Sequence, residues 1–148
     1  MAVSAFWYGL ALKDQWGTTA ADRVDFATDT IKTSLHTSSY TPNQDTDNYW
    51  DDATSEVSSS NYTSGGATLG SKTLTYTSGT NVVAFDAADA AWTTVSFTTR
   101  YAVVYKSTGT SSTSHLFSYV DFGADQTVSS GNFTVVWAAG GIATLTAS

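Results

Sequence analysis

Short runs of alternating hydrophobic and polar residues dominate the chain from residue 71 onward, and one more run lies at 30–37. In that first run Ile31, Thr33 and Leu35 alternate with polar residues, the period-two pattern of a strand with one buried face. Gly, Ser, Asn and Asp separate the runs, as is typical of turns. Strands are therefore predicted at 30–37, 72–77, 81–86, 92–98, 100–106, 115–122, 132–138 and 142–146. Strands of this length and spacing predict an all-β fold, an antiparallel β-sandwich of about eight strands.

The first 27 residues follow a different pattern. Segment 2–12 is apolar and predicts a strand or an extended arm, and 17–27 is the best candidate for the one short helix. The chain is therefore divided into an N-terminal arm, 1–27, and a β-sandwich domain, 28–148. The long polar stretch 38–70 is predicted to be a loop with a single helical turn around 46–53.

Composition excludes several classes of protein. The chain has 148 residues, a formal net charge of -7, 14% aromatic residues, only 13% charged residues and no cysteine. These figures argue against disorder, a membrane span, disulfides and thiolate metal sites. Six basic against thirteen acidic residues argue against nucleic-acid binding. The first basic residue is Lys13, so no secretory signal is expected.

The sequence contains two possible imidazole bases, His36 and His115. Each falls on the polar phase of its predicted strand, which favours a surface or edge position over a catalytic one. A Gly-x-Ser-x-Gly nucleophile motif is absent from the sequence. No catalytic residue is therefore predicted, and no enzymatic function or cofactor is expected.

Four acidic residues in the 38–70 loop could place oxygen ligands around Ca²⁺: Asp45, Asp47, Asp51 and Asp52. Their spacing does not match an EF-hand loop. Asp is also favoured in turns, because its side chain accepts hydrogen bonds from nearby backbone N–H groups. The turn interpretation is preferred, and Ca²⁺ binding is kept as the weaker alternative.

Large aromatic residues offer two further interpretations. Tyr49 and Trp50, with Trp16 and Trp92 as further candidates, could form a stacking platform for a sugar, whereas aromatics in a small sandwich usually fill the core or an interface. Low charge also suits a surface that is buried against other subunits. The predicted interface residues are the apolar side chains of the arm together with the loop pair: Phe6, Trp7, Tyr8, Leu10, Tyr49 and Trp50.

The sequence resembles a family of small structural proteins from the virions of tailed bacteriophages. The resemblance covers roughly residues 28–146 and is carried by Ile31-Lys…Leu35, Thr37-Ser-Ser-Tyr-Thr-Pro-Asn-Gln-Asp45, Tyr49-Trp-Asp-Asp52, Glu56-Val-Ser…Tyr62-Thr-Ser-Gly-Gly66, Leu69-Gly-Ser-Lys-Thr-Leu74, Arg100-Tyr-Ala-Val-Val-Tyr-Lys106, Tyr119-Val-Asp-Phe-Gly123 and Gly131-Asn-Phe-Thr-Val-Val-Trp137. It implies a structural component of the head or tail, assembled in the host cytoplasm, and it supplies no catalytic residues.

Three functions follow as expectations. The first is a capsid decoration (cement) protein on the outside of the head shell, with the major capsid protein as its partner and homo-oligomers as its form. The second is a tail, neck or fibre component of the same virion. The third is a carbohydrate-binding module that uses Tyr49 and Trp50. Nucleic acid and membranes are not expected partners.

Overall fold

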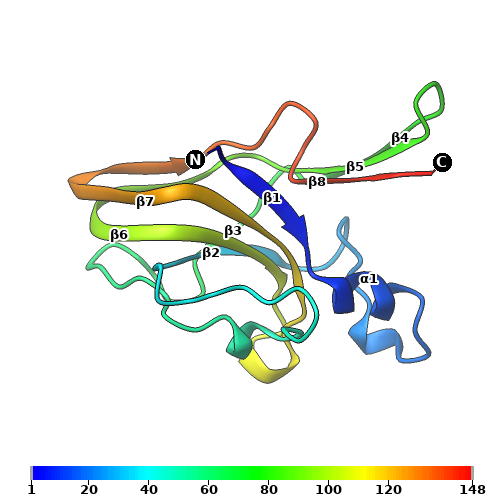
Figure 1. The fold of residues 1–148 in the computed structure, drawn as a ribbon, viewed down its shortest axis with the longest axis horizontal. Helices are drawn as coiled ribbons and strands as arrows, with labels where there is room; N and C mark the ends of the chain where they lie inside the picture. Colours follow the sequence, from blue (N-terminus) through cyan, green and yellow to red (C-terminus); the bar gives the residue numbers. More distant parts are fainter. Residues whose placement is uncertain (1, 148) are drawn as a thin grey trace.

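A computed structural model describes residues 2–147 and shows an all-β fold (Figure 1). Within these residues, 47% of which lie in strands, eight strands form two antiparallel sheets and are accompanied by a single short helix. The predicted antiparallel β-sandwich is therefore confirmed. Over the same residues, no helix combines the length and the hydropathy that a membrane crossing requires.

The larger sheet has five strands. In spatial order they are β1 (Ser4–Trp7), β7 (Leu116–Val135), β6 (Ala90–Lys106), β2 (Ile31–His36) and β3 (Ala67–Thr68). Strands β6 and β7 form a long hairpin whose connection contains the 3-10 turn η3 (Ser111–Thr113). Strand β2 matches its predicted position, whereas the two-residue β3 lies in the stretch predicted to be a loop.

Strands β6 and β7 are longer than predicted. The sequence predicts a break near residue 99 and a loop at 123–131, but both strands run through these positions. Bulges absorb the irregular residues, because the β6–β7 register shifts between Trp92 and Val95 and again between Thr99 and Tyr101. Gly123 lies inside β7 with φ 78°. The predicted breaks were therefore wrong. The sequence was misleading at Gly123 because a glycine in a β-rich segment can mark either a bulge or a loop.

The smaller sheet projects from the body beside the C-terminus (Figure 1). Its strands, in spatial order, are β4 (Thr73–Thr77), β5 (Val82–Asp86) and β8 (Ala143–Thr146). These bounds confirm the strands predicted at 72–77, 81–86 and 142–146. The turn before β8 contains Gly141 with φ 99°, where an added Cβ would lie 2.5 Å from the carbonyl oxygen of Phe85. Only glycine fits this turn without displacing β5.

The N-terminal segment folds back onto its own chain. Strand β1 pairs antiparallel with β7, so residues 4–7 are an edge strand of the five-stranded sheet and not a free arm. The helix α1 (Gly9–Gln15) follows directly, where the sequence predicted extended backbone, and the predicted helix at 17–27 is reduced to the 3-10 turn η1 (Ala20–Asp22). The buried residues Tyr8 and Ala11 are three positions apart, which is the spacing of one face of a helix. The neighbouring apolar residues hid this spacing, because a continuous apolar run suits a strand equally well.

The five-stranded sheet is covered on both faces. Ala102 and Val104 of β6 belong to the larger core cluster, which also contains Phe26 and Phe117, whereas Val103 belongs to a second cluster on the opposite face. Tyr8 and three side chains of the loop after β2 cover the second cluster. The loop residues are Tyr40, Trp50 and Ala53. Burial on both faces explains why residues 101–105 read as a continuous apolar run.

Candidate functional site

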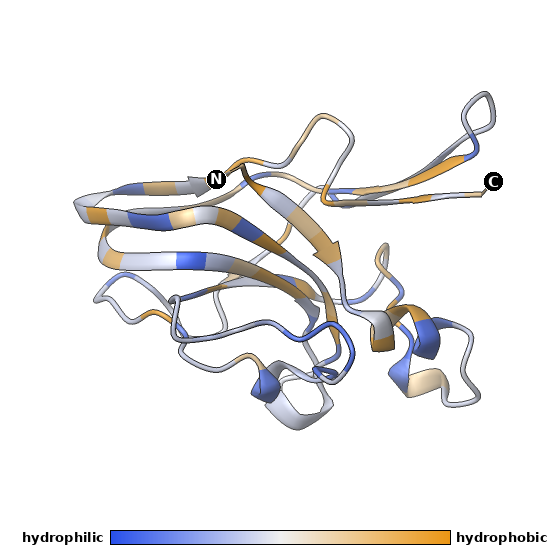
Figure 2. Ribbon diagram, in the orientation of Figure 1, coloured by the Kyte–Doolittle hydropathy of each residue, from blue (hydrophilic) through white to orange (hydrophobic). Residues whose placement is uncertain are grey.

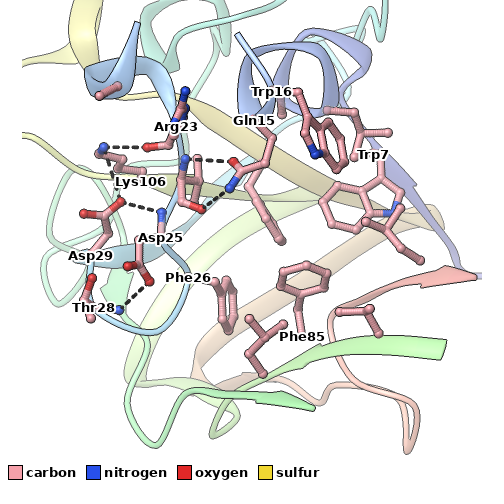
Figure 3. Close-up of a pocket in the computed structure, with 18 residues that line it drawn as sticks. Trp7, Gln15, Trp16, Arg23, Asp25, Phe26, Thr28, Asp29, Phe85 and Lys106 are labelled. Atoms are coloured by element: carbon pink, nitrogen blue, oxygen red, sulfur yellow. Dashed lines mark hydrogen bonds and ion pairs between the residues drawn. The ribbon is translucent and has the colours of Figure 1, made fainter. Parts of the chain in front are cut away.

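An open groove of about 740 Å³ lies between the smaller sheet and the N-terminal helix (Figure 3). Hydrophobic residues follow both of its sides along β1, α1, β5 and β8 (Figure 2). We call it the apolar groove and define it by six side chains: Trp7, Leu12, Trp16, Phe26, Leu74 and Phe85. The residues that line the groove come from segments far apart in the chain, so the local sequence patterns did not predict the groove.

Four aromatic rings form the floor of the apolar groove. Phe85 of β5 lies 5.3 Å from Trp7, 5.5 Å from Phe26 and 5.3 Å from Phe117, measured between ring centroids. The three contacts are edge-on, an arrangement that aromatic quadrupoles favour. These rings join the two sheets and the 17–30 segment into one packed unit.

One wall comes from α1 and the segment that follows it. The Gln15 side chain donates to the carbonyl of Val24 at 3.1 Å and accepts from its N–H at 3.0 Å. Arg23 donates to the carbonyl of Gly17 at 2.8 Å, closing the loop between them. These bonds hold the wall in place while Trp16, at the end of α1, remains 74% exposed.

Charged residues close one end of the groove (Figure 3). Lys106 lies 3.2 Å from the Asp29 carboxylate and donates to the carbonyls of Ala21 and Arg23 at 3.1 and 2.7 Å. Hydrogen bonds from Thr28 hold the pKa of Asp25 below its ordinary value. These charged groups already have partners within the chain, so they stabilise this end of the groove. The surface available to a ligand is the apolar one.

The smaller sheet forms the opposite wall. The register of β4, β5 and β8 places Leu74, Tyr76, Val83 and Leu145 on the same face as Phe85. Phe85 is packed into the floor, but Leu74 remains 51% exposed and Tyr76 60% exposed. The other face of β4 carries threonines. The sheet is therefore amphipathic, and the outer half of its apolar face has no cover within residues 2–147.

Comparisons with protein-family models, with curated proteins and with solved structures found no match for this chain. The residues and geometry of the apolar groove are therefore the evidence from which a function is proposed.

The four predicted interface residues of the arm have different positions and exposures in the structure. Tyr8 is fully buried, and its hydroxyl lies 2.8 Å from that of Tyr40. Burial raises the pKa of Tyr8, so this phenol stays neutral. Trp7 belongs to the groove floor, Leu10 is half-buried, and Phe6 is 38% exposed and stacked on Tyr119. Tyr8 was predicted to be an interface residue but belongs to the core of its own chain, whereas interface roles for Phe6, Trp7 and Leu10 stay predictions.

The Tyr49 and Trp50 rings do not form a shared platform. Trp50 is stacked on Tyr105 at 5.2 Å, whereas Tyr49 packs at a tilt against His115 at 4.5 Å, so each ring contacts a different residue. Both aromatics are half-buried. They anchor the loop to the five-stranded sheet, with Trp50 in the 3-10 turn η2 (Trp50–Asp52) near the predicted helical turn.

Two of the four acidic residues of this loop, Asp47 and Asp52, stabilise its turns. Asp47 accepts hydrogen bonds from the Tyr40 hydroxyl and from the N–H of Asn43, and Asp52 accepts from the N–H groups of Asn48 and Tyr49. Asp45 and Asp51 are exposed. Among the described residues, no group of three or more His, Asp or Glu side chains is arranged to hold a metal ion. The structure supports the turn interpretation for Asp47 and Asp52.

His115 is buried, which contradicts the predicted surface or edge position. It precedes β7, and its Nε2 lies 3.2 Å from the carboxylate of Asp22. The Tyr49 ring covers it, and an isolated bridge joins the two backbones. Asp22 belongs to the N-terminal segment, and no local pattern in the sequence predicts that this segment lies beside His115.

His36 is also fully buried, again against prediction, because the loop after β2 covers the polar phase of that strand. Its Nδ1 lies 2.8 Å from the carbonyl of Thr54 and its Nε2 lies 2.8 Å from the Ser34 hydroxyl, which accepts from the Trp50 indole. A carbonyl only accepts, so Nδ1 carries the proton and Nε2 accepts from Ser34. The chain of bonds is complete with a neutral imidazole.

Burial lowers the pKa of His36 below its ordinary value of 6.5. The unfolded chain therefore binds a proton at a pH where the folded chain does not, and stability falls as the pH drops below 6.5. One such group gives a slope of up to about 1.4 kcal/mol per pH unit. We expect His36→Asn, which can still donate to Thr54, to have a smaller loss of unfolding free energy than wild type between about pH 7.5 and 5.5. Denaturant unfolding at each pH measures both slopes; equal slopes would contradict this assignment.

Proposed function

We propose that this chain is a non-enzymatic structural protein of a tailed-bacteriophage virion, and specifically a decoration protein on the outside of the head. Its partner in this proposal is an extended apolar segment of the major capsid protein, held in the apolar groove. The observation that carries the proposal is the uncovered apolar surface of the groove, with Trp16 74% exposed and Leu74 51% exposed on opposite walls.

Four properties of the chain support an assembly role for this groove. Exposed tryptophan and tyrosine side chains are the commonest anchors of protein interfaces. The walls are braced by the Gln15–Val24 and Lys106–Asp29 contacts, so they need little ordering when a partner binds. The sequence resemblance to small virion proteins covers roughly residues 28–146, which include Phe85 and Phe117 of the floor and the wall formed by the smaller sheet. A formal net charge of -7 also suits a surface directed away from packaged DNA.

Substitution of Trp16 tests this binding surface. We expect Trp16→Ala to weaken binding to head shells that lack the chain by at least about tenfold, since a buried interface tryptophan typically contributes about 2 kcal/mol or more, on the order of thirtyfold. Co-sedimentation of the purified chain with such shells measures the affinity. Val136→Ala is the matched control, because Val136 is 71% exposed and does not line the groove. Unchanged binding of Trp16→Ala would exclude the groove as the capsid-binding surface.

A further inference from the structure

Strand β4 is an open edge of the smaller sheet. Within β5, Phe85 directs its carbonyl toward β8, where it accepts from the N–H of Ile142 at 2.7 Å. Backbone groups alternate sides along a strand, so the pairing of β4 with β5 uses Thr73, Thr75 and Thr77. The N–H and C=O groups of Leu74 and Tyr76 therefore point away from the sheet.

The other edge of this sheet is already used. Thr144 of β8 directs its carbonyl outward, where it accepts a hydrogen bond from the Trp7 indole at 3.1 Å. Strand β4 has no comparable cover within residues 2–147, since all five of its residues are exposed. It also lacks the charged residues, proline and bulges that usually protect an edge. An edge of this kind is a template for another strand.

We propose that the occupant of this edge is a second copy of the chain, whose β4 pairs antiparallel with the first about a two-fold axis at Thr75. The two smaller sheets then form one continuous sheet of six strands. The sequence Thr73-Leu-Thr-Tyr-Thr77 is nearly palindromic, so the strand is complementary to itself. The two-fold pairing places Leu74 opposite Tyr76 of the second copy, and Tyr76 opposite its Leu74.

This register satisfies both the backbone and the side chains. The outward groups of Leu74 and Tyr76 form hydrogen-bonded pairs, and Thr75 faces its own copy in the intervening non-hydrogen-bonded position, as antiparallel alternation requires. Opposed residues of an antiparallel pair share a face, so the exposed Leu74 and Tyr76 side chains of both copies join their apolar faces. A register shifted by one residue would oppose threonines to these apolar side chains.

The association closes at two copies, because each chain contributes one β4 edge to a two-fold interface. Two five-residue strands bury less than the roughly 1,200–2,000 Å² of a stable complex. The dimer is therefore reversible and concentration-dependent. This inference does not rest on the proposed virion function: it concerns the isolated chain, whereas the Trp16 experiment measures binding to head shells.

Disulfide trapping tests the pairing and its register. The chain has no cysteine, so single variants give an unambiguous result. In Thr75→Cys the two copies place their Cα atoms roughly 4.5 Å apart, within disulfide range. In the control, Thr77→Cys, the new thiol faces Thr73 of the second copy and has no thiol opposite. With oxidised glutathione, we expect Thr75→Cys to form covalent dimers at least about tenfold faster than Thr77→Cys, and sedimentation equilibrium to show wild type as a monomer–dimer equilibrium.

Two results would overturn the proposal. Equal trapping of Thr75→Cys and Thr77→Cys would show random collision, and a wild-type chain that remains monomeric up to its solubility limit would show that the edge does not pair. A wild-type chain that does not dimerise but still binds head shells would refute this inference and leave the proposed function intact. A wild-type chain that dimerises but does not bind head shells would refute the proposed function and leave this inference intact.

Discussion

Replacement of Gly66 by alanine is expected to destabilise the protein by about 3 kcal/mol or more. Gly66 adopts φ 72°, and an added Cβ would lie 1.9 Å from the carbonyl oxygen of Thr33 and 2.6 Å from the Cα of Ser34. A left-handed backbone costs an alanine roughly 1–2 kcal/mol. The methyl group must also push the chain away from β2, because both neighbours are backbone atoms. The contact between Gly66 and β2 immediately precedes the β2–β3 pairing, so β3 would detach from the sheet.

Denaturant unfolding of Gly66→Ala and of a control, Gly70→Ala, measures this effect. A Cβ added to Gly70 would have no atom within 4 Å, and Gly70 has no left-handed φ, so alanine there is expected to change stability by no more than about 1 kcal/mol. Similar stabilities for the two variants would contradict the close approach of Gly66 to β2.

Phe117→Ala is expected to cost about 3–5 kcal/mol, the usual loss for a buried phenylalanine. Phe117 is 4% exposed, and its ring lies 4.6 Å from Trp7, 5.3 Å from Phe26 and 5.3 Å from Phe85. Its removal leaves a cavity where the two sheets and the N-terminal segment meet. The floor of the apolar groove would lose its support, so binding to head shells should weaken as well.

Phe6→Ala serves as the comparison for Phe117→Ala. Phe6 is 38% exposed and is stacked on one ring, that of Tyr119, so its loss should cost about 1 kcal/mol. Unfolding free energies from denaturant titrations separate the two variants. A Phe117→Ala protein as stable as Phe6→Ala would mean that the junction between the sheets is not packed as described.

Much of the β fold could be predicted from local sequence, because short runs of β-prone residues bounded by turn residues identify strands whether one face or both are buried. Strand β2 and the three strands of the smaller sheet are the clearest cases. The bulges of β6 and β7 could not be predicted in the same way, since Gly123 has the same appearance in a bulge as in a loop. The helix α1 was concealed by a run of apolar residues that suits a strand equally well.

The candidate site depended on contacts between distant segments. Trp16, Leu74 and Phe85 line the same groove only because the N-terminal segment and the smaller sheet lie beside each other, and no local pattern specifies that arrangement. His36 shows the same limit. Its strand alternates as if one face were exposed, but a loop closed by Tyr40 and Trp50 covers that face. Periodicity therefore identified two faces of the strand without showing that both were buried.

The position and number of copies in the virion test the central claim most directly. Under the proposed function, a three-dimensional reconstruction of virions purified from the source of this chain should show the β-sandwich on the outer head surface. Its copy number should approach that of the major capsid protein subunits or of the local three-fold axes. Density for the chain only on the tail, neck or fibres, in six or twelve copies, or no copies in the particle, would contradict the decoration assignment.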